Sequence, residues 1–367
     1  MVSAYRGLWS EGLVQGRAGG GTVVALPGRK REAPHPVYQP LLWDDLYTER
    51  VPDLFPWTSA PRLPADEEPL NFARGDPATD LLPLDSMWEG LSEVKRQGHA
   101  SLRYAPPQGN PELRARLAES LELRGMRASP SQILVLSGGG QGTYLAAQAF
   151  LERGDGVVVE SPTYPEALRI FRAVGAQLRP VPLDEGGLRL DVLEETLSRL
   201  RPKLIYVTPT FHNPIGITMP TERRERLLEL ACRYRVPILE DDPFPGLCYD
   251  GESVPPLAAL DRQGTVLHLS TLSKVFAAGL RIGWLLSPVA ERLTLLKSSI
   301  DLCTSPLSQA VATALFPRRL SRHLETIVPI YRSRRDTLCA ALVREGANAL
   351  RFSRPGGRPL PLGDARA

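Results

Sequence analysis

Lys274 is the residue of this chain whose type and surroundings best suit covalent chemistry. It ends the run LHLSTLSK (residues 267–274), where an apolar stretch passes into hydroxyl residues, and Arg281 follows seven positions later. A partly buried lysine has a depressed pKa and can form a Schiff base, while hydroxyls and an arginine can hold a phosphate. Only five of the 44 basic residues are lysines, which favours a specific role for this one. A surface lysine just past a strand is the alternative.

A second candidate for phosphate binding is the glycine run SGGGQG (residues 137–142), which follows the apolar residues 133–136. Glycines let backbone N–H groups approach an anion, and the dipole of a following helix favours negative charge there. The run lacks the Gly-Lys-Ser/Thr of a P-loop, and Thr143 breaks a G-x-G-x-x-G pattern. A plain tight turn remains the alternative.

Three further side chains stand just after apolar stretches. Tyr164 lies between two prolines and could stack on a flat cofactor, or else cap the core. Asn213 precedes a proline on a short turn, and an ordinary Asn-Pro turn explains it equally well. Asp241 would be partly buried, which requires a cation such as a protonated ring nitrogen, a helix N-cap or a structural ion pair.

The elements that must position these residues alternate between strand and helix. Short apolar runs predict strands, and helical spacing of leucines predicts helices between them. This alternation predicts an α/β fold with a mainly parallel sheet covered on both faces, which binds ligands at the carboxyl ends of its strands. The strands are expected at residues 133–136, 157–160, 204–207, 237–239 and 266–269, and the helices at 110–124, from the glycine run to 151, 166–174 and 221–234.

Composition narrows the class of protein further. The 367 residues are 43% hydrophobic and 23% charged, which is typical of a globular protein, and the net charge of +3 does not require a nucleic-acid partner. The four cysteines are far apart and are interpreted as reduced thiols, with no metal site, in a cytoplasmic protein. No apolar run approaches about 18 residues, so no membrane span is expected.

Taken in order, these motifs resemble the fold-type I pyridoxal-phosphate enzymes of the class I/II aminotransferase family. The resemblance runs from about residue 69 to 357, and the spacings from Asn213 to Asp241 and from Asp241 to Lys274 agree with it. It also rests on Tyr104 with Gly109. It implies the PLP-transferase fold, with a central sheet of the seven-stranded type sandwiched by helices, and pyridoxal 5'-phosphate as cofactor.

The resemblance also implies a role for each matching residue. Lys274 would form the internal aldimine and move the substrate's α-proton, Asp241 would keep the pyridine nitrogen protonated, and Tyr164 would stack on the ring. Tyr104 would reach the phosphate of the neighbouring subunit, which implies a homodimer, and Gly75 would lie at the substrate. The complete cofactor-binding set is Gly139, Gly140, Gln141, Tyr164, Asn213, Asp241, Thr271, Ser273, Lys274, Arg281 and Tyr104.

The first 25 residues resemble the end of the recognition helix and the wing of a GntR-type winged helix. The matching segments are AYRGL (4–8), EGLV (11–14) and GGGTVV (19–24), and a chance glycine hairpin is the alternative. A proline-rich linker at 26–68, a pyridoxal-phosphate-binding large domain at 69–300 and the start of a small C-terminal domain at 301–367 complete the layout of MocR-type regulators. Because both end domains look incomplete, a frameshift or truncation is expected, and specific DNA binding is doubtful.

Two departures from the family bear on activity. Pro243 and Phe244 stand where the family usually has a tyrosine, which removes one hydrogen bond worth roughly 0.5–1.5 kcal/mol. The arginine that grips the substrate carboxylate has no counterpart, so weakened substrate binding is expected. The sequence predicts transfer of an α-amino group between an amino acid and a 2-oxo acid. A MocR-type transcription regulator and an inactive truncated fragment are the alternatives.

Overall fold

The computed structural model describes residues 2–25, 75, 77–98, 103–251, 253–346, 350–352, 354–357 and 363–365. The chain forms two compact units, Met1–Thr48 and Glu49–Ala367, and each has its own helices and strands. The predicted linker at residues 26–68 lies outside the described residues, as do residues 358–362 near the C-terminus.

The first unit consists of one helix and one hairpin. Helix α1 (Val2–Ser10) is followed by the antiparallel strands β1 (Val14–Arg17) and β2 (Gly21–Val24). The hairpin turn places Gly19 and Gly21 at φ +79° and +82°, a backbone conformation that favours glycine. The helix has no buried residue, and Trp9 is 58% exposed. A helix followed by a hairpin is the order expected for the end of a recognition helix and a wing.

The second unit is built on a mainly parallel sheet with the strand order β3-β10-β9-β8-β7-β4-β5-β6. Strands β5, β4, β7, β8 and β9 run parallel, β10 is antiparallel to both of its neighbours, and β6 is antiparallel to β5. The strands are β3 (Ile133–Leu136), β4 (Gly156–Ser161), β5 (Gln177–Asp184), β6 (Gly187–Leu188), β7 (Leu204–Val207), β8 (Ile238–Asp242), β9 (Val266–Thr271) and β10 (Gly283–Leu286). The predicted α/β class is confirmed. The sheet has one strand more than the expected seven-stranded type, and the two-residue strand β6 lies at its edge.

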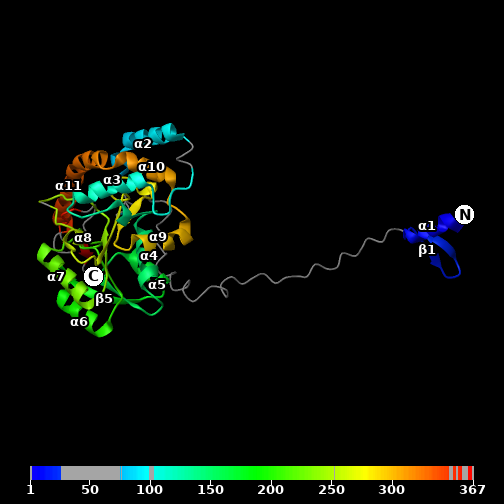
Figure 1. Cartoon of the computed structure of the whole chain (residues 1–367), viewed down its shortest axis with the longest axis horizontal. Helices are drawn as coiled ribbons and strands as arrows, with labels where there is room; N and C mark the ends of the chain where they lie inside the picture. Colours follow the sequence, from blue (N-terminus) through cyan, green and yellow to red (C-terminus); the bar gives the residue numbers. More distant parts are fainter. Residues whose placement is uncertain are drawn as a thin grey trace. The chain divides into compact units, whose positions relative to one another are not determined.

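Helices cover both faces of this sheet (Figure 1). One face packs on α4, α5 and α9 through residues such as Leu145, Phe171 and Leu293. The other packs on α6, α7 and α8 through residues such as Leu193 and Leu227. The helices are α2 (Leu84–Gln97), α3 (Pro111–Glu122), α4 (Gly139–Phe150), α5 (Pro165–Ala173), α6 (Leu190–Leu200), α7 (Thr221–Tyr234), α8 (Leu257–Leu260), α9 (Ala290–Asp301), α10 (Pro306–Leu315) and α11 (Arg318–Gly346).

A third apolar cluster joins the β3–β10 end of the sheet to α3, α10 and α11, and it includes Leu113, Trp284 and Leu315. Short 3-10 turns lie at Thr79–Leu81, Pro130–Gln132 and Ala278–Leu280, and an antiparallel pair is formed by β11 (Leu350–Phe352) and β12 (Gly363–Ala365). No helix in the described part of the chain has the length and apolar character needed to cross a membrane.

Strand β8 shows how the fold distributes its polar residues. Side chains alternate between the two faces of a strand, so Leu239 and Asp241 share the face covered by α4 and α5. Glu240 and Asp242 therefore point to the opposite face, toward α7 and α8. Because β4, β7, β8 and β9 are parallel, the residues at their carboxyl ends meet along one edge of the sheet.

Candidate active site

Lys274 lies in the turn that follows β9, at the edge where the parallel strands end. Its side chain is half-buried. A Cβ added to Gly75 would lie 3.7 Å from Lys274 Nζ, so the N-terminal segment of this unit passes directly beside the amine. The structure thus brings together the residue proposed as nucleophile and the residue expected at the substrate.

Asp241 lies near the end of β8, and its Oδ2 accepts a 2.6 Å hydrogen bond from Tyr206 Oη on β7. Burial raises the pKa of Asp241 to about 6; the hydrogen bond from Tyr206 opposes that shift, and the charge of Asp242 adds to it. A carboxylate in such a place is stabilised by a cation at its remaining oxygen.

The glycine run forms the turn from β3 into α4. Gly138 caps the helix with φ +102° and ψ 167°, so the first N–H groups of α4, at Gly139 and Gly140, point out of the helix end. Arg281 lies across this turn: its Nη2 donates to Ser137 O at 3.2 Å. A Cβ on Gly138 would come within 2.2 Å of the same nitrogen, so only glycine allows this approach.

Hydroxyl groups complete the other side of this cup. Arg281 Nη1 donates to Ser273 Oγ at 3.3 Å, and Thr271 Oγ1 donates to Ile282 O at 3.0 Å and lies 3.0 Å from Ser273 Oγ. The Arg281 side chain is exposed while its backbone is left-handed at φ +53°. A guanidinium, two hydroxyls and a helix N-terminus therefore converge, which is a donor set suited to a phosphate.

Gln141 stands in the same turn but its amide is committed to the protein. Its Oε1 accepts from Ser137 N at 2.8 Å, and its Nε2 donates to Asp301 Oδ2 at 2.8 Å. Asp301 also pairs with the buried Lys297, Nζ to Oδ1, at 2.8 Å. The side chain of Gln141 thus fixes the shape of the glycine turn.

Tyr164 and Asn213 lie on neighbouring loops at the same edge. Tyr164 immediately precedes α5, and burial, with the nearby charge of Asp241, raises its pKa to about 12. Asn213 is half-buried in the loop after β7. Tyr104, in contrast, is 84% exposed and is not brought to these residues within the chain.

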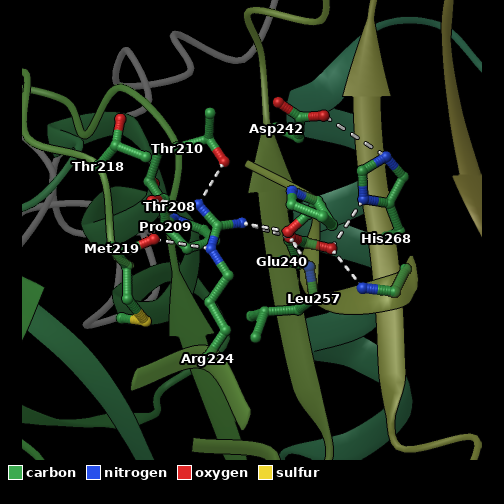
Figure 2. Close-up of polar contacts among 12 residues, drawn as sticks. Thr208, Pro209, Thr210, Thr218, Met219, Arg224, Glu240, Asp242, Leu257 and His268 are labelled. Carbon is green, nitrogen blue, oxygen red and sulfur yellow. Dashed lines mark hydrogen bonds and ion pairs between the residues drawn. The ribbon is translucent and has the colours of Figure 1, made fainter. Parts of the chain in front are cut away.

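A buried ionic cluster supports this edge of the sheet from the opposite face (Figure 2). His268 on β9 lies between Glu240 and Asp242, with Nδ1 2.9 Å from Glu240 Oε2 and Nε2 3.7 Å from Asp242 Oδ2. Arg124 pairs with Asp242 at 2.7 Å, and Arg224 lies 3.9 Å from Glu240. Within the described part of the chain, Glu240 and Asp242 are thus matched by Arg224, Arg124 and His268, while Asp241 points to the opposite face of the sheet.

Arg224 also anchors the loop that carries Asn213. The guanidinium is fully buried and donates to Met219 O at 2.8 Å and to Pro209 O and Thr210 Oγ1, both at 2.9 Å (Figure 2). On the other side of the loop, Glu160 Oε2 accepts from Thr208 N at 2.8 Å and lies 3.2 Å from His212 Nε2. The loop is therefore held at both ends.

These residues fit pyridoxal phosphate. The cup at Gly138 and Arg281 suits the phosphate, the carboxylate of Asp241 suits a protonated ring nitrogen, and Lys274 supplies the amine. The fold is that of the fold-type I pyridoxal-phosphate proteins. Residues 67–353 match the family model for aminotransferase class I and II. The chain therefore belongs to this family, and its cofactor is pyridoxal 5'-phosphate.

Known relatives include both enzymes and regulators. The chain is 36% identical over 306 residues to the aromatic-amino-acid aminotransferase 1 of Thermococcus litoralis, covering 81% of this chain and 73% of that protein. It is 32% identical to YisV, an uncharacterised HTH-type transcriptional regulator of Bacillus subtilis, covering 97% and 74%. The crystal structure of Pyrococcus horikoshii kynurenine aminotransferase with PMP superposes with a TM-score of 0.77 at 32% identity, covering 88% and 80%.

Sequence reasoning missed several residues that shape the site. Tyr206 sits inside the apolar run LIYV and has the pattern of a core residue. Lys297 and Asp301 are four residues apart on a helix, which indicates a pair but not its contact with Gln141. The acidic run EDD at the end of β8 was the available signal that buried cations must lie nearby.

Proposed function

We propose that this chain binds pyridoxal phosphate covalently through Lys274 and transfers an α-amino group between an amino acid and a 2-oxo acid. The observation that carries the proposal is the convergence, at one sheet edge, of the Lys274 amine, the Asp241 carboxylate and the cup between Gly138 and Arg281. Pyridoxal phosphate bound there supplies an electron sink for the substrate's α-carbon.

Each residue then has a defined task. Lys274 holds the cofactor and afterwards moves the α-proton as a general base, and Asp241 keeps a proton on the ring nitrogen. Tyr164 stacks on the ring and Asn213 donates to its phenolic oxygen. The phosphate is held by the N–H groups of Gly139 and Gly140 and by the side chains of Thr271, Ser273 and Arg281. Gln141 contributes by fixing the turn.

The proposed working form is a cytoplasmic homodimer. The exposure of Tyr104 supports a role in which this side chain completes the phosphate cup of a second copy. Gly75 supports a substrate position beside Lys274, because any side chain there would occupy space 3.7 Å from Nζ. The four free cysteines are compatible with a reducing compartment.

The test is cofactor binding followed by turnover. We expect the parent chain and the control Lys203→Ala, at an exposed lysine, to bind pyridoxal phosphate covalently, as judged by absorbance and by the mass increment after borohydride reduction. Lys274→Ala should retain no covalent label. Amino-group transfer to 2-oxoglutarate from a panel of amino acids would then identify the substrate. A parent chain that folds but takes up no label would contradict the proposal and favour an inactive relative.

A second candidate is a cofactor-responsive transcription regulator. The helix and hairpin of residues 2–25 and the similarity to YisV over 97% of this chain favour it. In this case residues 1–25 would be the winged-helix part, and 26–68 would link it to the cofactor-binding domain at 69–300 and the domain beginning at 301. Fluorescence anisotropy with duplex DNA, with and without pyridoxal phosphate, separates the two. Cofactor-dependent DNA binding without turnover would support the regulator.

A further inference from the structure

Tyr206 is a fully buried tyrosine whose hydroxyl donates a hydrogen bond to Asp241, a carboxylate of the candidate active site. Its ring lies in the core between the sheet and α5, where it meets Phe171 edge-on with centroids 5.6 Å apart and planes at 69°. Its Oη donates to Asp241 Oδ2 at 2.6 Å. Packing therefore fixes the ring, and the ring fixes the position of the hydroxyl.

We propose that Tyr206 is a positioning residue for Asp241, which holds one carboxylate oxygen in place so that the other is directed at the ring nitrogen of the cofactor. This inference rests on the proposed function. It adds a residue that lies one strand away from Asp241 and 35 positions earlier in the sequence. Among the described residues, the only side chain hydrogen-bonded to Asp241 is Tyr206.

The direction of this hydrogen bond is fixed by the chemistry of the two groups. Burial, reinforced by the charge of Asp241, raises the pKa of Tyr206 well above its ordinary value. The phenol therefore stays protonated at every working pH and acts as a permanent donor. Its hydrogen bond favours the ionised form of Asp241, against the burial that raises the pKa of that carboxyl.

Other charged groups act on Asp241 from each neighbouring strand. Asp242 on its own strand and Glu160 on β4 raise its pKa, and His268 on β9 lowers it. The raised pKa of Tyr164 also reflects the charge of Asp241 from the cofactor side. None of these groups is changed when the hydroxyl of Tyr206 alone is removed, so the effect of Tyr206 can be measured by itself.

Tyr206→Phe tests the inference because it keeps the ring and its packing. Cofactor affinity should fall about tenfold, which corresponds to about 1.4 kcal/mol. The acid limb of cofactor binding should move to higher pH, because Asp241 without its donor ionises less readily. Tyr249→Phe is the matched control: Tyr249 is also buried, but its Oη has no hydrogen-bond partner in the described part of the chain, so neither quantity should change.

A double-mutant cycle excludes a merely structural role. If Tyr206 acts through Asp241, Tyr206→Phe should lower the free energy of unfolding less in an Asp241→Asn background than in the parent. Equal changes in both backgrounds, or a Tyr206→Phe variant with the affinity and pH limb of the parent, would overturn the inference while leaving the proposed function intact. A parent chain that binds no pyridoxal phosphate would overturn both.

Discussion

Asp301, at the C-terminal end of α9, accepts a hydrogen bond from the side chain of Gln141, which lies in the turn between β3 and α4. The two atoms, Gln141 Nε2 and Asp301 Oδ2, are 2.8 Å apart. Through this contact, and through Ser137 N donating to Gln141 Oε1, the glycine turn is tied to a helix more than 150 residues away in the sequence. The shape of the anion cup thus depends on α9.

Replacement of Asp301 by alanine should therefore weaken both stability and cofactor binding. The side chain of Lys297 is fully buried and would lose the carboxylate that pairs with it at 2.8 Å. Loss of one partner of a buried pair costs about 3–5 kcal/mol, and the partial exposure of Asp301 places the expected loss near the lower end. Chemical denaturation and a pyridoxal phosphate titration measure the two effects.

Glu229→Ala is the control for Asp301→Ala. Glu229 is 64% exposed and pairs with Arg226 on the surface of α7, so its loss should change stability by less than about 1 kcal/mol. If Asp301→Ala lowered stability but left the dissociation constant of the cofactor within twofold, the contact with Gln141 would have no role in shaping the cup.

Gly138→Ala should reduce cofactor affinity by tenfold or more. The added Cβ would lie 2.2 Å from Arg281 Nη2 and displace the guanidinium from the turn. The backbone strain at φ +102° adds a stability loss of about 1–3 kcal/mol. Gly154→Ala separates the two causes, since Gly154 has φ +93° and open space around it. Equal cofactor affinities in the two variants would show that Arg281 does not depend on Gly138.

The parts of the fold that could be predicted are those in which local pattern and tertiary role agree. The run LIYV gives β7 and the leucine spacing of residues 221–234 gives α7, both with the expected bounds. Strand β8 runs three residues past the predicted end at Leu239, because Arg124 and Arg224 pair with acidic residues that would otherwise end a strand, and His268 Nδ1 lies 2.9 Å from Glu240 Oε2.

Other features depend on partners that spacing does not reveal. Strand β5 contains Pro180 and Pro182, and prolines argue against a strand because they lack a backbone N–H. On its β6 side, however, β5 is paired only at Leu183 and Asp184. The two prolines therefore lie where β6 forms no ladder with β5. Gln141 was expected to bind the cofactor because of its place in the glycine run. Only the fold shows that Asp301 engages its amide.

Asp241 should make the ligand-free protein less stable as pH rises. Its pKa is raised to about 6 in the folded state from an ordinary value of 3.8, so the folded protein binds more protons than the unfolded chain between these values. Stability attributable to this group therefore falls as pH rises through that window, by about 3 kcal/mol. Asp241→Asn should abolish this fall and also abolish cofactor binding.

Urea denaturation of the parent and of Asp241→Asn at pH 5 and at pH 8, without cofactor, checks this prediction. The stability of the variant relative to the parent should increase with pH, since only the parent must ionise a buried carboxyl. A relative stability that is the same at both pH values would mean that Asp241 ionises as readily in the folded chain as in the unfolded one.

Arg224→Met should destabilise the protein by about 3–5 kcal/mol, because it leaves Glu240 without its arginine and several buried acceptors without donors. The loop that carries Asn213 would lose its anchor at Pro209 and Thr210 (Figure 2), so cofactor affinity should fall as well. Arg224→Lys should recover little of the lost stability, since one ammonium group cannot make all the hydrogen bonds of the guanidinium.

Arg233→Met, at an exposed pair with Glu194, is the control and should change stability by less than about 1 kcal/mol. A thermal melt and a cofactor titration of the variants would decide the matter: full affinity in Arg224→Met would mean that the loop keeps its position without the anchor.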